Sequence, residues 1–148
     1  MKRPFLLWLL VLALIFLGLG GLYGGINMLA DPTGGLMNME AVLPQLGVPN
    51  YILPGLFLFF VMGLFPLFLC YALITRPTWL RIERLLPWRT YHWAWVSTIA
   101  LSIVLFIWLS VQGILIGFVW PIQFVTLSNG IIILLIALLP PLSRYYKK

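Results

Sequence analysis

The fold is decided by the stretch RPTWLRIERLLPWR at residues 76–89, the one long charged interruption in an otherwise apolar chain. This stretch carries four of the nine lysines and arginines, and the other five lie at residues 2–3 and 144–148. Each apolar half between these clusters is long enough for two membrane-crossing helices of roughly 20 residues. The chain therefore crosses out and back twice, and its three basic clusters share one side of the membrane.

Composition indicates the same class of protein. Of the 148 residues, 63% are hydrophobic and 8% are charged, which is too little polar surface to cover a water-soluble core. Because lysine and arginine are enriched in cytoplasmic loops, the shared side is predicted to be cytoplasmic. The sequence thus predicts an all-α integral membrane four-helix bundle, multi-pass in the cytoplasmic (inner) membrane of a bacterium, with the N and C termini cytoplasmic.

The predicted organisation is a single transmembrane domain at residues 1–148. We expect spans at about 4–26, 53–75, 93–116 and 121–139, a longer outer loop at 27–52 and a cytoplasmic loop at 76–92. Pro66 removes one backbone hydrogen bond from the second span, which predicts a kink near residues 62–66. Asn38 is expected to cap a short helix over residues 39–46 in the outer loop.

The charge distribution indicates what the cytoplasmic face meets. The formal net charge of +6 is confined to the ends of apolar segments, which favours anionic lipid headgroups over nucleic acid as the partner. Within the cytoplasmic loop, an apolar helical stripe predicts a short helix in the headgroup plane, formed by Trp79, Ile82, Leu85 and Leu86. The expected headgroup contacts are Arg76, Arg81, Arg84 and Arg89.

The sequence offers no set of residues for catalysis or for holding a metal. No ionisable residue lies near the middle of a span, where such a group usually marks a proton or ion pathway. His92 is the single histidine and Cys70 the single cysteine, so one chain supplies neither paired axial ligands nor a zinc set. We therefore predict a non-enzymatic protein with no cofactor and no metal.

Glycines at four-residue spacing predict close helix packing, because they let two helix backbones approach. The first span contains Gly20, Gly21, Gly24 and Gly25, and the outer end of the third span contains Gly113 and Gly117. Packing within the bundle is the first interpretation of these glycines, and a face for self-association is the second.

Uncharged polar and aromatic residues near the outer ends of the last two spans form a candidate ligand pocket. These residues are Trp108, Gln112, Trp120 and Gln123. Interhelical hydrogen bonds that hold the bundle together would explain the two glutamines equally well. A pocket under the long outer loop would suit a lipid or small amphiphile better than an ion.

Three segments give the chain a family resemblance. They are Gly24-Gly25 through Asp31-Pro32-Thr33-Gly34, then Leu53-Pro54-Gly55-Leu56-Phe57, then Trp108 through Gln112 to Gly117. In these segments the chain resembles a group of small four-span bacterial membrane proteins of unassigned function. The resemblance implies the four-span architecture and no activity.

Two functions are compatible with these features. The leading expectation is an accessory or assembly subunit that packs against a larger membrane protein, or against itself as a homo-oligomer, through its glycine faces. The alternative is the binding or transport of a hydrophobic small molecule or lipid through the outward-facing polar pocket. A transporter or binding protein should hold its ligand alone, whereas an accessory subunit should depend on its partner.

Overall fold

The computed structural model describes residues 2–86 and 88–148, and the described chain is all helical. Four long helical segments are each long and apolar enough to cross a membrane. They are α1 (Phe5–Ala30), a composite second helix, α6 (Trp93–Ile116) and α7 (Pro121–Leu138). The composite helix consists of α3 (Ile52–Phe57), η3 (Leu58–Leu64) and α4 (Phe65–Thr75). The four predicted segments are therefore present, and α1 extends through the glycine run to Ala30.

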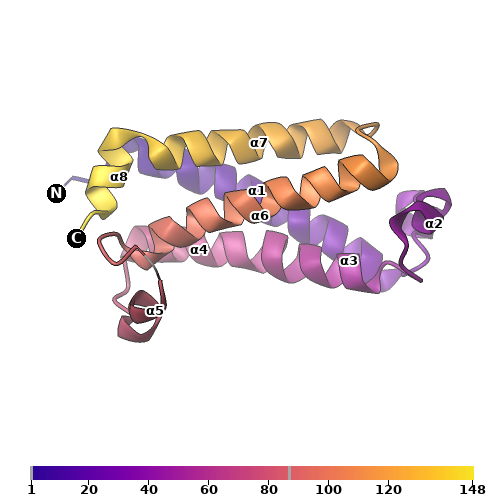
Figure 1. Cartoon of the computed structure of the whole chain (residues 1–148), viewed down its shortest axis with the longest axis horizontal. Helices are drawn as coiled ribbons and strands as arrows, with labels where there is room; N and C mark the ends of the chain where they lie inside the picture. Colours follow the sequence, from indigo (N-terminus) through magenta and orange to yellow (C-terminus); the bar gives the residue numbers. More distant parts are fainter. Residues whose placement is uncertain (1, 87) are drawn as a thin grey trace.

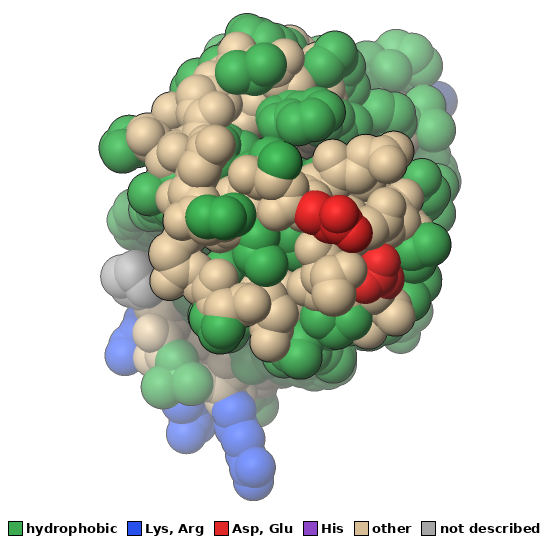
Figure 2. Space-filling view, turned by 90° about the vertical axis from the view of Figure 1, so that its right-hand side faces the viewer, with side chains coloured by type: hydrophobic (Ala, Val, Ile, Leu, Met, Phe, Trp, Pro, Cys, Tyr) green, Lys and Arg blue, Asp and Glu red, His purple; other side chains and the backbone are tan. Residues whose placement is uncertain are grey.

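The short elements gather at the two ends of the bundle (Figure 1). At one end, here called the loop end, lie η1 (Gly35–Met37), η2 (Glu40–Val42) and α2 (Leu43–Leu46). At the other, the basic end, lie both termini, α5 (Leu80–Leu85) and α8 (Pro140–Tyr146). Figure 2 looks onto the loop end, which carries the acids Asp31 and Glu40, and the basic side chains in view stand apart from the acidic ones.

The long helices differ in how they pack. α1 crosses the bundle diagonally, starting beside α7 at the basic end and finishing beside α3 at the loop end (Figure 1). α6 packs on α7 and on α4. The most buried leucines, including Leu10, Leu14, Leu69 and Leu73, form a core in the basic half. The two halves of the bundle are therefore packed differently.

Pro66 is accommodated in the composite helix by a π-helical segment that precedes it. Proline has no N–H, so the Met62 carbonyl loses its ordinary partner four residues later. The backbone responds by forming the π-helical segment η3, which ends with the Phe65 N–H donating to the Phe60 carbonyl five residues earlier. The distortion predicted at residues 62–66 therefore takes the form of a π-helical segment.

Prolines also leave helix-end carbonyls without partners, and buried aromatic side chains bind them. The residues four positions after Leu73 and Ala137 are Pro77 and Pro141, which have no N–H to donate. The Tyr146 hydroxyl donates to the Leu73 carbonyl at 2.7 Å, and the Trp95 indole donates to the Ala137 carbonyl at 2.8 Å. These two bonds fix α8 and α6 to the ends of their neighbours.

The loop between α1 and α3 is built around Asp31 and not around an Asn38 cap. Asp31 accepts the Thr33 N–H and hydroxyl at 3.1 and 2.6 Å and the Leu36 N–H at 3.1 Å. The Thr33 hydroxyl is the main cause of the lowered pKa of Asp31. Asn38 instead has a positive φ of 53° and ends η1, so the expected helix over residues 39–46 is split into η2 and α2.

Candidate functional site

The loop-end half of the bundle contains a cavity of about 730 Å³ that is open to the surface. Its walls come from α1, η3, α6 and α7, and Met37 and Met39 of the loop also line it. The volume falls within the range of roughly 300–1,000 Å³ that is usual for small-molecule sites. The cavity is the candidate functional site of this chain.

The cavity exists because α1 and α7 diverge. Near the basic end they are in contact, and the Asn129 amide nitrogen donates to the Ala13 carbonyl at 3.0 Å. Beyond that bond α1 crosses towards α3 (Figure 1), so the face of α7 that follows Asn129 towards the loop end has no helix directly against it. The side chains Thr126 and Gln123 line the resulting space.

The two ends of the Gln123 amide at the cavity wall have different surroundings. Its Oε1 accepts the N–H groups of Val119 and Trp120, both at 3.1 Å, and so satisfies donors at the start of α7. Its Nε2 is buried and makes no hydrogen bond within the described residues. A buried donor without a partner costs free energy on the order of 1–3 kcal/mol, so a shift of the neighbouring side chains that opens this amide to the cavity would give it a favourable partner in a ligand.

Further uncharged polar groups follow Gln123 along the same wall. Gln123, Thr126 and Asn129 recur every third residue, so they share one face of α7. The half-buried Gln112 on α6 also lines the cavity and makes no side-chain hydrogen bond among the described residues. Among the described residues, no charged side chain lines the cavity. The site therefore offers hydrogen bonds to a ligand and no counter-ion.

The remaining walls are apolar and adaptable. Trp108 lies in the wall and contacts Phe57 in a tilted arrangement with ring centroids 4.5 Å apart, and Trp120 lines the loop end. All four described methionines, Met28, Met37, Met39 and Met62, also line the cavity. Thioether side chains are flexible and polarizable and can fit ligands of different shape. The structure thus brings the four predicted pocket residues together in one cavity wall and adds the methionines.

The glycines of α1 divide between two faces. Gly21 and Gly25 lie against the backbone of Met62 and Phe59, and this contact joins α1 to the composite helix. Gly24 lines the cavity, and a Cβ at Gly20 would meet no atom within 4 Å. The first span therefore packs Gly21 and Gly25 against the composite helix and leaves Gly20 open, whereas Gly24 is buried with an added Cβ 3.3 Å from the Leu58 side chain.

Gly113 and Gly117 of the third span pack against, or belong to, the turn that follows α6, and not a neighbouring helix. A Cβ at Gly113 would collide with the ring of Phe118 in the following turn. Gly117 has a positive φ of 75° and ends α6, a conformation that side-chain-bearing residues rarely adopt. Both positions therefore serve the turn between α6 and α7.

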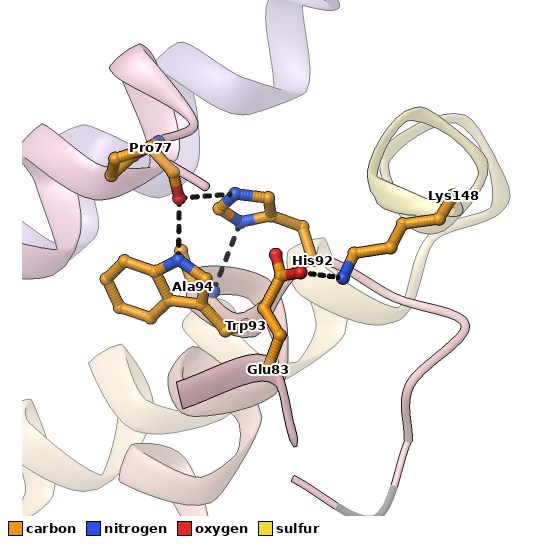
Figure 3. Close-up of polar contacts among 6 residues, drawn as sticks. All are labelled: Pro77, Glu83, His92, Trp93, Ala94 and Lys148. Atoms are coloured by element: carbon orange, nitrogen blue, oxygen red, sulfur yellow. Dashed lines mark hydrogen bonds and ion pairs between the residues drawn. The ribbon is translucent and has the colours of Figure 1, made fainter. Parts of the chain in front are cut away.

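At the basic end, His92 connects the loop to α6 (Figure 3). Its Nδ1 accepts the Ala94 N–H at 3.2 Å, so Nε2 carries the proton and donates to the Pro77 carbonyl at 3.2 Å. The Trp93 indole donates to the same carbonyl at 2.8 Å. Burial is the main cause of the lowered pKa of His92. This histidine is a neutral helix cap.

The predicted headgroup arginines differ in their surroundings. Arg76 lies over the rings of Tyr145 and Tyr146, 4.8 and 5.5 Å from their centroids. Arg81, Arg84 and Arg89 are exposed at the basic end. In the same region Lys148 pairs with Glu83 at 2.6 Å (Figure 3). Arg76 thus contributes to folding of the C-terminal segment, whereas the other three remain accessible.

No family model, curated protein or solved structure matches the chain. Within the described residues no group of three or more His, Cys, Asp or Glu side chains is placed to hold a metal ion. Sequence reasoning missed Thr126 and the methionines as wall residues. Three of the methionines lie between residues 28 and 39, and that clustering was the available signal.

Proposed function

We propose that this protein is a non-enzymatic membrane protein that binds a hydrophobic small molecule or lipid in the cavity at its loop end. The observation that carries the proposal is the cavity of about 730 Å³, whose mostly apolar lining includes Gln112, Gln123, Thr126 and Asn129; among the described residues the Gln123 Nε2 has no partner. An apolar pocket with few convergent polar groups is the usual form of a small-molecule site.

The proposed setting is the cytoplasmic membrane of a bacterium, with the basic end facing the cytoplasm. The three basic clusters and the four apolar helices support this orientation. Exposed Arg81, Arg84 and Arg89 then lie at the depth of anionic headgroups and hold that end at the interface. The cavity correspondingly belongs to the outer half of the bilayer.

An accessory role remains the second candidate, and the open glycine face favours it. Gly20 has no neighbour within 4 Å of an added Cβ, so a helix of a larger protein or of a second copy could approach α1 there. The two candidates differ in what occupies the cavity. If the protein binds a small molecule, a ligand fills the cavity; if it is an accessory subunit, a partner helix covers the edge of the cavity at Gly20.

The test is native mass spectrometry of the protein extracted gently from its own membrane. Binding predicts a retained amphiphile on the isolated chain, and an accessory role predicts a stoichiometric larger protein without one. Thr126→Phe should obstruct the part of the cavity beside Gln123 and lower retention, whereas the control Thr126→Val keeps the volume and should retain the molecule. Retention by Thr126→Phe equal to that of the control would refute the site.

A further inference from the structure

The cavity has a mouth on the side of the bundle. Several lining residues are also well exposed at the surface, and a residue that does both must lie where the cavity opens. On α1 they are Phe16, Leu19, Gly20 and Tyr23, and on α7 they are Trp120 and Ile122. The mouth is therefore the gap between the diverging helices α1 and α7.

In the proposed membrane setting, the mouth faces hydrocarbon and not water. Both helices are of membrane-crossing length, and Leu19 and Ile122 on opposite rims are 58% and 63% exposed. The loop residues Met37 and Met39 lie between the cavity and the loop end. A molecule dissolved in the bilayer therefore reaches the cavity without leaving the apolar phase.

The size and chemistry of the space select the occupant. The lining carries the uncharged polar side chains of Gln112, Gln123, Thr126 and Asn129 on otherwise mostly apolar walls. A flexible chain fits, and the uncharged amides of Gln112 and Gln123 suit a neutral headgroup better than an ionic one.

Resting on the proposed binding function, we propose that the ligand is a lipid with an uncharged polar head. It enters sideways from the loop-end leaflet through the gap between α1 and α7. Its chain passes over Gly20 and lies against Leu105 and Leu109, which line the cavity and are 1% and 3% exposed. Gly20 is the one position on this route where the backbone itself forms the rim without a neighbouring atom.

The test uses the full chain in phosphatidylcholine vesicles that contain a monoacylglycerol with a photoactivatable diazirine in its chain. After illumination, mass spectrometry locates the labelled residues. Labels on Leu105 and Leu109 are expected, because these side chains line the cavity and have almost no exposed surface, so only a chain inserted between the helices reaches them. Gly20→Leu should lower that labelling about tenfold, equivalent to about 1.4 kcal/mol of lost access, since it obstructs the mouth without a clash.

Two further variants complete the test. Ala100→Leu places the same side chain at an exposed position of α6 away from the cavity and should label as the wild type does. Ile122→Trp narrows the opposite rim and should act like Gly20→Leu. Unchanged labelling of the buried leucines in both rim variants would refute lateral entry and leave the binding site standing. Labels confined to exposed residues in the wild-type protein would refute the binding proposal itself.

Discussion

Replacement of Gly21 by alanine should destabilise the bundle, and the same change at its neighbour Gly20 should not. A Cβ at Gly21 would overlap the Met62 carbonyl and lie 2.6 Å from the Gly63 nitrogen, and these are backbone atoms that cannot rotate away. Overpacking of this kind costs about 1–3 kcal/mol. Alanine itself favours a helix over glycine by about 0.5–1 kcal/mol, and this gain is common to both variants.

The difference between the two variants therefore isolates the packing clash. It should amount to about 1–3 kcal/mol, or roughly a 5- to 150-fold change in the ratio of unfolded to folded protein. Unfolding in mixed micelles, followed by tryptophan fluorescence as denaturing detergent is added, measures it for Gly21→Ala and Gly20→Ala side by side. Equal stability of the two variants would contradict the division of the α1 glycines into a packed and an open face.

The basic end supplies two further predictions. Tyr146→Phe removes the donor to the Leu73 carbonyl and should lower the free energy of unfolding by about 1–3 kcal/mol. Tyr145→Phe is the control and should cost less, because among the described residues the Tyr145 hydroxyl makes no hydrogen bond. Thermal unfolding in detergent compares the two variants. Burial holds the pKa of His92 below its ordinary value of 6.5, so its contribution to stability is present above that pH and is lost as the pH falls towards the lowered pKa. His92→Asn keeps an acceptor for the Ala94 N–H but does not titrate, so the thermal midpoint should fall less between about pH 7.5 and about pH 5.5 than in the wild type. An equal fall in both proteins would show that other groups cause the pH dependence.

Helix existence was predictable because it depends on local composition. A run of apolar residues of membrane-crossing length has to form a helix to satisfy its backbone, so the four spans followed from the sequence with small errors at their ends. The outer loop was harder. Asparagine is common at helix starts, but the hydrogen bonds that Asp31 accepts stabilise a different local structure around Asn38. Residue propensity alone does not predict which of two such local structures forms.

For the candidate site, the sequence predicted which residues take part but not how they are arranged. Gln112 and Gln123 stood out because amides are rare in apolar spans, and Trp108 and Trp120 stood out as aromatic residues near the outer ends. Their common cavity with the methionines depends on the angle at which α1 crosses the bundle. No sequence pattern states that angle, because it results from the close backbone contact of Gly21 and Gly25 with the composite helix.

The sequence by itself thus determined the class of protein, the four helices and the shared side of the basic clusters. These follow from hydrophobicity and charge, which act on each segment separately. Only the tertiary structure decided which glycines pack, where the bundle is hollow and on which side it opens. Those properties arise from contacts between segments distant in the chain, because the packing of α1 against one neighbour determines how far it stands from another.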